Sequence, residues 1–286
     1  MIKWPSPAKL NLFLYITGRR QDGYHYLQTL FQFLDYGDTV SIVSNQRGTL
    51  QLITPVADIK EENNLIIRAA NLLRIQAEIH GTLSTKVGAT FSIEKRIPIG
   101  GGLGGGSSNA ATVLIALNYL WNTRFSLKHL SLLALQLGAD VPAFIWGLTS
   151  FADGIGDRLI PLLLDEKWYL IIYPRISISS FQVFSDFHLT RDTPRRHIKD
   201  LLLHPFHNDC ERIVRKRCNE VETVISWLSR YASPHMTGTG SCIFAEFNTK
   251  KAALNILNRI PEQWQGFVAR GVNTSPLHTF FSRIVN

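Results

Sequence analysis

Hydrophobic positions in the first half of the chain alternate between the spacing of strands and the spacing of helices. Short runs that are apolar or alternating predict strands at Leu10–Ile16, Thr39–Val43 and Thr90–Glu94. Longer stretches with apolar residues at helical spacing, or rich in alanine and leucine, predict helices at Asn64–His80, Ser107–Trp121 and Ser126–Leu137. Gly81 and Gly138 follow two of these helices and are expected to end them.

The second half is expected to begin near Phe151–Arg158, where Gly154 and Gly156 mark a turn. Further strands are predicted at Trp168–Tyr173, Ile243–Phe247 and Phe267–Val272, helices at Cys210–Tyr231 and Lys251–Arg259, and an irregular serine-rich segment at Ile176–Thr193. These elements alternate without the regular spacing of parallel crossovers. The pattern therefore favours an α+β protein of two domains, 1–158 and 159–286, joined near residues 155–165.

The composition is that of a soluble globular protein, with 45% hydrophobic and 18% charged residues. The three cysteines form no Cys-x-x-Cys pair, so neither a disulfide framework nor structural zinc is expected, and we predict reduced thiols in a cytoplasmic protein. No run reaches the roughly 18 apolar residues of a membrane span. Asn11 interrupts the first apolar run, which follows Pro5 and Pro7, so a signal peptide is not expected.

The formal net charge of +8 admits nucleic acid, anionic lipid or a phosphorylated small molecule as a partner. The densest basic stretches are Arg191–Lys199 and Arg212–Arg217. Neither stretch has aromatic residues between its basic ones, which favours a solvated surface. Charge alone therefore does not choose among these partners.

A glycine-rich stretch separates the strand at Thr90–Glu94 from the helix at Ser107–Trp121, and six of its eleven residues are glycine. Without side chains, its backbone N–H groups can approach an anion closely, and the N-terminus of the following helix carries partial positive charge. The first turn of that helix has no acidic residue and so leaves the position free for an external phosphate. The residues predicted to bind phosphate are Pro98, Ile99, Gly100, Gly101, Gly102, Leu103, Gly104, Gly105, Gly106, Ser107 and Ser108.

Three alternative roles for this loop fit its sequence less well. A flexible turn capped by serine would make six glycines entropically costly without a gain. A Walker A loop needs Gly-Lys-Ser/Thr, which the chain lacks. A nicotinamide-binding loop needs an acidic residue about 20 positions further on, and Arg124–Lys128 contains none.

Three motifs lie in order along the chain: Pro7-Ala-Lys-Leu-Asn-Leu12, the glycine-rich loop with the Ser-Ser-Asn-Ala-Ala111 that follows it, and Thr237-Gly-Thr-Gly-Ser-Cys242. Together they resemble the motifs of the GHMP kinases, named for galactose, homoserine, mevalonate and phosphomevalonate kinases. The resemblance implies a small-molecule kinase that uses ATP and Mg²⁺. It also implies an N-terminal domain like the second domain of ribosomal protein S5, a ferredoxin-like C-terminal domain, and an active site in the cleft between them.

Two more elements, Asp22-Gly-Tyr-His25 and Leu137-Gly-Ala-Asp-Val-Pro142, resemble one branch of that family. This branch phosphorylates the 2-hydroxyl of a substrate that carries a cytidine diphosphate group, in the non-mevalonate synthesis of isoprenoid precursors. Leu10 and the segment 153–157 depart modestly from the pattern of the branch. The alternatives are a kinase of the homoserine or mevalonate type and, from the charge, a nucleic-acid binding protein. We expect no nucleic acid or membrane partner, and a monomer or weak homodimer.

Asp140 and Lys9 are the candidate catalytic residues. Val141 precedes Pro142 and is expected to be extended, which places Asp140 on a turn; alternatively Asp140 caps a short helix at Pro142–Trp146. Lys9 could simply discourage pairing at a strand edge. The resemblance implies instead that Asp140 is the catalytic base and that Lys9 lies beside it, keeps it ionised and stabilises developing negative charge.

The resemblance also implies a substrate pocket. Tyr24 would stack on a cytosine base, which is typically worth about 1–3 kcal/mol, and His25 would hydrogen-bond the edge of that base. Phe184 is the candidate for the opposite face of the base, and Asn11 would orient the substrate near Lys9. A packed tyrosine and a surface histidine are the alternative. A further set, Gly238, Thr239 and Gly240, forms either a wall of the phosphate site or a plain hairpin turn.

Overall fold

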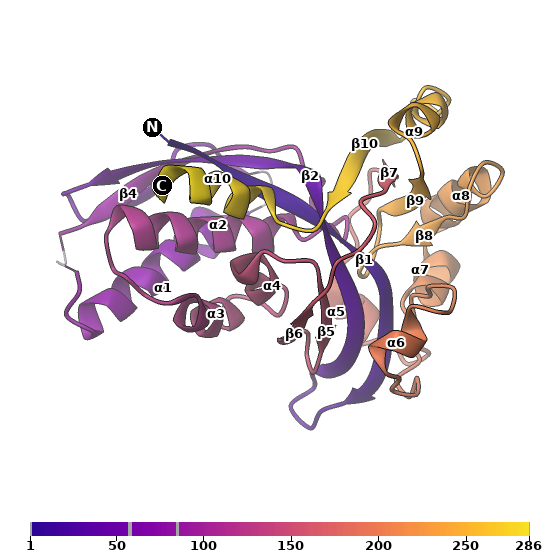
Figure 1. Cartoon of the computed structure of the whole chain (residues 1–286), viewed down its shortest axis with the longest axis horizontal. Coiled ribbons are helices and arrows are strands. Elements are labelled where there is room, and N and C mark those ends of the chain that lie inside the picture. The colour runs from indigo at the N-terminus through magenta and orange to yellow at the C-terminus, as the bar shows by residue number, and fades with distance from the viewer. Residues whose placement is uncertain (1, 57–58, 84–85, 286) are drawn as a thin grey trace.

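The computed structural model of the chain describes residues 2–56, 59–83 and 86–285. Within these residues one ten-stranded sheet runs through both halves of the molecule, with helices packed against it (Figure 1). Its strands are β1 (Ile2–Arg19), β2 (His25–Asn45), β3 (Leu50–Leu52), β4 (Gly88–Glu94), β5 (Ser150–Asp153), β6 (Arg158–Pro161), β7 (Trp168–Tyr173), β8 (His235–Met236), β9 (Ile243–Phe247) and β10 (Gln265–Val272). All strand pairs are antiparallel except β3 with β4.

Strands β1 and β2 form a long curved hairpin that joins the two halves. They pair from Ile2 opposite Ile42 to Arg19 opposite His25, with register shifts at three places along β1. Beyond this hairpin, β2 also pairs with β4, β5 and β10. One strand therefore reaches both halves, and residues of β1 can contact elements that are far away in the sequence (Figure 1).

In the N-terminal half, helices cover one face of the sheet (Figure 1). They are η1 (Glu61–Asn63), α1 (Leu65–Ile79), α2 (Gly105–Leu120), α3 (Leu127–Leu135), α4 (Val141–Trp146) and α10 (Pro276–Val285). Helix α2 is central: the ten consecutive residues from Ser108 to Leu117 are buried. Helix α10, close to the C-terminus, packs against this half. There the ring of Phe280 lies edge-on to that of Trp4, with ring centres 5.4 Å apart.

The C-terminal half has the chain order β7, helices, β8, β9, α9, β10. Its helices are α5 (Ser180–Phe184), α6 (Ile198–Leu201), α7 (Glu211–Arg217), α8 (Asn219–Leu228) and α9 (Lys250–Leu257). The strands lie in the order β10-β7-β9-β8. A β-α-β-β-α-β chain with this antiparallel order is the ferredoxin-like arrangement, so the predicted fold of this half and the α+β class are confirmed.

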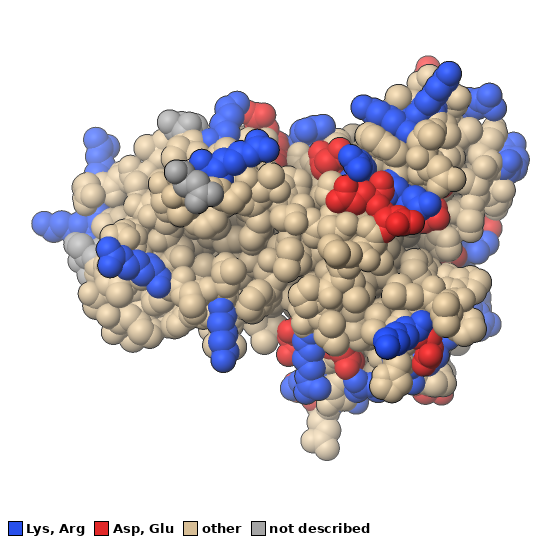
Figure 2. Space-filling model, viewed as in Figure 1, with Lys and Arg blue, Asp and Glu red and all other residues tan. Residues whose placement is uncertain are grey.

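The surface carries charge without one dominant patch on the face seen in Figure 2. Lys and Arg side chains are scattered over that face, and Asp and Glu side chains gather between them near the junction of the two halves. Among the described helices, none combines the length and the apolar character that crossing a membrane requires.

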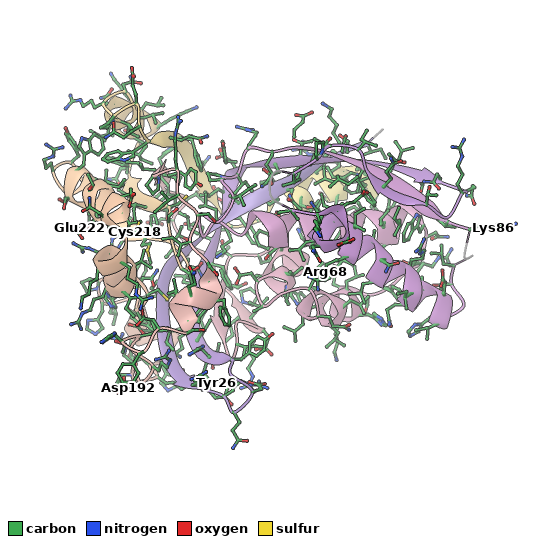
Figure 3. All side chains as sticks on the ribbon, turned by 180° about the vertical axis from the view of Figure 1, so that it is seen from behind. Tyr26, Arg68, Lys86, Asp192, Cys218 and Glu222 are labelled. Atoms are coloured by element: carbon green, nitrogen blue, oxygen red, sulfur yellow. The ribbon has the colours of Figure 1, made fainter. Side chains whose placement is uncertain are left out.

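Most predicted elements are present, and three predictions are wrong. The segment expected to be irregular at Ile176–Thr193 contains the short helix α5. The single helix expected at Cys210–Tyr231 is two helices, because Cys218 is extended (φ −129°, ψ 99°) and separates α7 from α8 (Figure 3). Val214 and Val221 lie in the same hydrophobic cluster, so the apolar pattern stays in phase across the break and hides it. Val141 is helical rather than extended, because it is the first residue of α4. Pro142 is the second residue of this helix, where a backbone N–H would have no partner within the helix, so proline costs no hydrogen bond there. The domain boundary at 158/159 stays a prediction.

Candidate active site

The glycine-rich loop leads from β4 to the N-terminus of α2, and several segments hold it in place. The N–H of Lys9 donates to Leu103 O (3.1 Å), that of Cys242 to Gly101 O (3.1 Å), and that of Ile178 to Gly100 O (3.2 Å). Gly104 precedes α2 with a left-handed backbone (φ 73°). The loop is thus fixed by β1 and by both segments that approach it from the C-terminal half.

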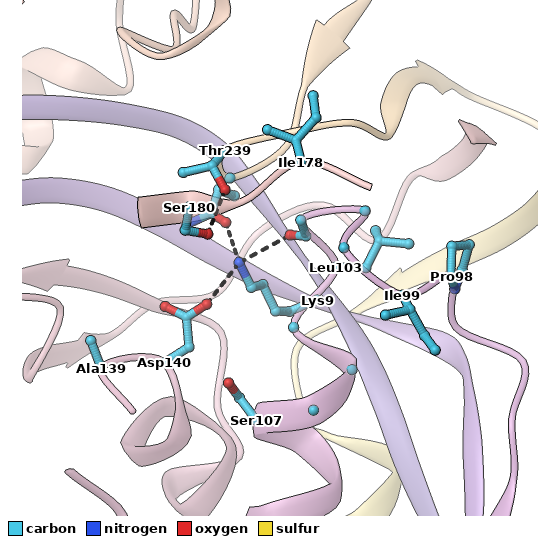
Figure 4. A pocket seen from close by; sticks show the side chains of 18 of the residues that line it. Lys9, Pro98, Ile99, Leu103, Ser107, Ala139, Asp140, Ile178, Ser180 and Thr239 are labelled. Atoms are coloured by element: carbon cyan, nitrogen blue, oxygen red, sulfur yellow. Dashed lines mark hydrogen bonds and ion pairs between the residues drawn. The ribbon is translucent and has the colours of Figure 1, made fainter. Parts of the chain in front are cut away.

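A cavity of about 500 Å³ lies over this loop, and all of Pro98–Ser107 lines it. Pro98 and Ile99 lie on one side of Lys9, and Ser180 and Thr239 lie on the other (Figure 4). Ser108 is different: its side chain is fully buried and its Oγ accepts a hydrogen bond from Ser6 Oγ at 2.9 Å. Ser107 is therefore the serine that faces the cavity.

Lys9 and Asp140 meet in this cavity. The Nζ atom of Lys9 lies 3.2 Å from Oδ2 of Asp140 (Figure 4). Lys9 is only 3% exposed, and its Nζ also donates to Gly102 O at 3.3 Å and lies 5.3 Å from the centre of the Phe31 ring. Asp140 lies on the turn before α4, as predicted, but its side chain makes no capping hydrogen bond. The carboxylate faces the lysine instead.

Asn11 is held in one orientation beside Lys9. Its Oδ1 accepts a hydrogen bond from Lys9 Nζ, and its Nδ2 donates to Thr29 Oγ1 at 2.8 Å. Its backbone N–H donates to Thr237 Oγ1 at 2.9 Å. Because the partners come from β1, β2 and the turn after β8, the amide oxygen is directed at the ammonium and cannot rotate freely.

The second glycine-rich turn contacts the first. Gly238, Thr239 and Gly240 line the cavity, and Thr239 Oγ1 lies within hydrogen-bond distance of Ser180 Oγ at 2.8 Å. A Cβ atom at Gly102, whose φ is +79°, would lie 2.3 Å from Thr237 O. Two backbones pack here at a distance that only glycine allows.

The predicted base-binding residues are only partly together. Phe184 lines the cavity, and its ring stacks on that of His25 with centres 5.1 Å apart and an interplanar angle of 23°. His25 is 7% exposed, and burial lowers its pKa, with the positive charges of Arg191 and Arg19 adding to the effect. Tyr24 lies on the turn before β2, is 56% exposed and is not among the residues that line the cavity.

Asp38, a residue that the sequence did not single out, anchors the loop. Its Oδ1 accepts the N–H groups of Arg96 (2.7 Å) and Ile97 (2.8 Å), and its Oδ2 accepts from Lys95 Nζ (2.6 Å) and Asn109 Nδ2 (3.0 Å). One buried carboxylate therefore ties the segment just before the loop to helix α2 just after it. The sequence signal is weak, because β2 holds two acids, Asp35 and Asp38, and only the second is buried.

Several residues of the cavity come from elements that the sequence pattern could not bring together. They include Thr29, Phe31, Ile178 and Ser180. Each lies in a stretch that looks like an ordinary buried strand, helix or loop. Only the pairing of β1 with β2 and the return of the C-terminal half place them at one site.

Both halves of the chain match a known protein family. The N-terminal domain of the GHMP kinases matches residues 64–148, and the C-terminal domain of the same family matches residues 197–266. Together the two matches cover more than half of the chain, and each lies in the half of the fold where that domain is expected. The chain belongs to the GHMP kinases, a family of small-molecule kinases.

Solved structures agree with this assignment. The chain is 29% identical to a 4-(cytidine 5'-diphospho)-2C-methyl-D-erythritol kinase, with a TM-score of 0.81 over 94% of this chain and 99% of that one. It also has the fold of Methanococcus jannaschii mevalonate kinase (15% identity, TM-score 0.65, 95% and 98% covered). Homoserine kinase from Cytophaga hutchinsonii shares that fold too (15% identity, TM-score 0.64, 96% and 95% covered).

Proposed function

We propose that this chain transfers the terminal phosphate of ATP to the 2-hydroxyl of 4-diphosphocytidyl-2-C-methyl-D-erythritol. The observation that carries the proposal is the Lys9–Asp140 pair, which faces the glycine-rich loop across one cavity. The similarity to a kinase of that substrate along 94% of the chain supports the choice of acceptor. We expect the enzyme to act in the cytoplasm, in the synthesis of isoprenoid precursors, as a monomer or weak homodimer.

The cavity fits ATP on one side. The N-terminus of α2 and the glycines before it offer N–H groups and partial positive charge to phosphates. Lys95 lines the cavity close to the loop, where its ammonium also pairs with Asp38. Val56, Ile59 and Leu65 line the cavity with apolar side chains, which suits the flat base of a nucleotide.

The donor set around the loop fits a magnesium ion bound mainly through phosphate. Within the described ranges there is no group of three acidic, histidine or cysteine side chains that could hold a metal ion. Ser107 offers a hydroxyl at the cavity, and magnesium commonly keeps few protein ligands beside phosphate oxygens and water. Bound in this way, the ion would neutralise charge on the phosphates.

The chemistry follows from the two catalytic candidates. The acceptor hydroxyl oxygen bonds to the terminal phosphorus, the bond from that phosphorus to the ADP oxygen breaks, and Asp140 takes the hydroxyl proton. Lys9, buried and paired with Asp140, stabilises negative charge at the transferred group. Asn11 keeps the ammonium in position through its amide oxygen.

Phe184, His25 and Tyr24 are the proposed contacts of the cytosine. Phe184 lines the cavity, and His25 lies directly behind it. Tyr24 is exposed next to His25, and we propose that its ring stacks on the bound base. The wall formed by Gly238, Thr239 and Gly240 would then contact the substrate between the base and the reacting hydroxyl.

The proposal is tested by measuring ADP release with Mg-ATP and one acceptor at a time. The acceptors are 4-diphosphocytidyl methylerythritol, homoserine, mevalonate and galactose, and Asp140→Asn is the control. Turnover of the cytidyl substrate alone, lost in the variant, supports the proposal. Turnover of another alcohol would support the kinase activity but refute the proposed substrate. Absence of turnover with all four would overturn the proposed reaction.

A further inference from the structure

The guanidinium of Arg191 is fixed by hydrogen bonds to four acceptors. Its Nε donates to Nε2 of His25 at 3.0 Å. One terminal nitrogen donates to the carbonyl oxygens of Phe184 (2.8 Å) and Asp186 (2.7 Å), and the other donates to that of Leu189 (3.1 Å). Arg191 therefore holds the chain around Phe184 and touches the His25 ring in one defined geometry.

This contact determines where His25 carries its proton. A guanidinium has only donors, so Nε2 of His25 has to accept and cannot hold a hydrogen. Burial and the neighbouring positive charges of Arg191 and Arg19 lower the pKa of His25, so the ring is neutral. A neutral imidazole without hydrogen on Nε2 carries it on Nδ1.

The Nδ1 atom of His25 has no hydrogen-bond partner among the residues that the structure describes, and it is not among the fully buried atoms that lack one. His25 does not itself line the cavity. The Phe184 ring, which lines the cavity, stacks on the same imidazole. Arg191 thus holds both the backbone of Phe184, whose ring lines the cavity, and the His25 imidazole that stacks on that ring.

We infer that Arg191 is a positioning residue that locks His25 as an Nδ1–H donor and thereby makes the pocket select cytosine over uracil. The inference rests on the proposed function, because it needs a pyrimidine base beside His25. Cytosine presents a hydrogen-bond acceptor at N3, where uracil carries a hydrogen. The fixed Nδ1–H of His25 can donate a hydrogen bond to N3 of cytosine. It cannot bond to N3–H of uracil, and both N–H groups would then remain without an acceptor.

The protonation state is measurable without any activity. Long-range ¹H–¹⁵N correlation spectra of the ¹⁵N-histidine-labelled protein distinguish the two neutral tautomers and the imidazolium. The His25 signals are assigned by their loss in His25→Gln. We expect the Nδ1–H tautomer of His25 at neutral pH, and loss of this single form in Arg191→Met. A neutral Nε2–H ring or an imidazolium in the unmodified protein would overturn the inference.

Selectivity is measured as the ratio of kcat/KM for the cytidine substrate to that for its uridine analogue. We expect Arg191→Met to lower this ratio by about 10- to 100-fold while kcat with the cytidine substrate changes little. His25→Gln should also lower the ratio, since an amide can turn either its oxygen or its NH₂ towards the base. Arg195→Met, in the same segment but paired with Asp153, is the matched control and should keep the ratio.

The outcomes separate the role of Arg191 from the proposed function. A merely structural role for Arg191 predicts equal losses with both substrates, so an unchanged ratio in Arg191→Met would overturn the inference and leave the kinase intact. Arg191→Lys repeats the measurement with the charge retained if the methionine variant does not fold. Turnover of neither substrate by the unmodified protein would overturn the proposed function and, with it, the selectivity.

Discussion

The side chains of Lys9 in β1 and Asp140 before α4 meet in the cavity, with Nζ and Oδ2 3.2 Å apart. Lys9 is buried on three sides by Asn11, Gly102 O and the Phe31 ring, whereas the Asp140 side chain remains 38% exposed. The lysine is thus fixed, and the carboxylate remains accessible to a substrate. This difference suits a stationary charge and a group that exchanges a proton.

Removing either member of this pair should slow the chemical step. We expect Asp140→Asn to lower kcat by about 10²- to 10⁴-fold, the usual contribution of a general base, with a small change in the KM for ATP. Lys9→Met should have a comparable effect, and the double variant should be less impaired than the product of the two, because the residues act together. Steady-state ADP release measures all three variants.

Lys3→Met is the matched control for these variants. Lys3 lies on the same strand, but its side chain is exposed and pairs with Glu94. Its loss should leave kcat unchanged. A kcat for Asp140→Asn close to that of the unmodified enzyme would refute the role of Asp140 as base.

Replacing Asp38 by asparagine should loosen the glycine-rich loop. The change removes the charge that pairs with Lys95 and turns one acceptor oxygen into a donor, which we expect to lower the free energy of unfolding by about 2–3 kcal/mol. Since the loop is the proposed phosphate site, the KM for ATP should rise more than that for the acceptor. Thermal unfolding and steady-state kinetics test both effects. Asp35→Asn, an exposed acid on the same strand, should change neither.

Alanine at Gly102 should disturb the contact between the two glycine-rich turns. The new Cβ would lie 2.3 Å from Thr237 O, a backbone atom that cannot turn away. Gly81 is the matched control, because its φ is also positive (+64°) and nothing lies within 4 Å of its Cβ position. Gly81→Ala should lower the free energy of unfolding by about 1–2 kcal/mol, the cost of the left-handed backbone alone.

Gly102→Ala should lower the free energy of unfolding further and reduce the affinity for ATP. Urea unfolding and nucleotide binding by calorimetry measure the two effects. Equal stability losses and equal ATP affinity in the two variants would show that the turns are not in close contact.

The stability of the protein should fall in mild acid. Burial lowers the pKa of His25, His235 and His278 in the folded chain. In the unfolded chain the pKa of a histidine is about 6.5. As the pH falls through that value, the unfolded chain binds protons that the folded chain does not, so the free energy of unfolding decreases; above it, this contribution is fully present.

Thermal unfolding between about pH 8 and about pH 5 should therefore show a constant midpoint at first and then a decline. His278→Gln, whose amide can keep the hydrogen bond to Ile145 O, should show a weaker decline. The lowered pKa values of Asp22 and Glu222 affect stability only in a more acidic range, below about pH 5, outside the range of this measurement. A midpoint that is independent of pH down to about 5 would contradict the prediction.

Much of the fold could be predicted because local physics decides it. Asn64 and Ser126 cap α1 and α3 with their side chains, and the predicted helices begin at or next to them. The strands β7 and β9 have the predicted bounds, since continuous apolar runs of that length suit a buried strand. The break at Cys218 could not be predicted, because the apolar pattern continues through it.

The sequence by itself determined the class of protein and the nature of its site. A loop with six glycines before an alanine-rich helix forms a phosphate-binding surface through backbone geometry and helix polarity, which neighbouring residues alone dictate. Only the tertiary structure decided which side chains act there. The contacts of Lys9 with Asp140, Asp38 with Asn109, and Arg191 with His25 join residues far apart in the chain. Strand pairing and packing around the long β1–β2 hairpin bring them together, and no local pattern encodes such distances.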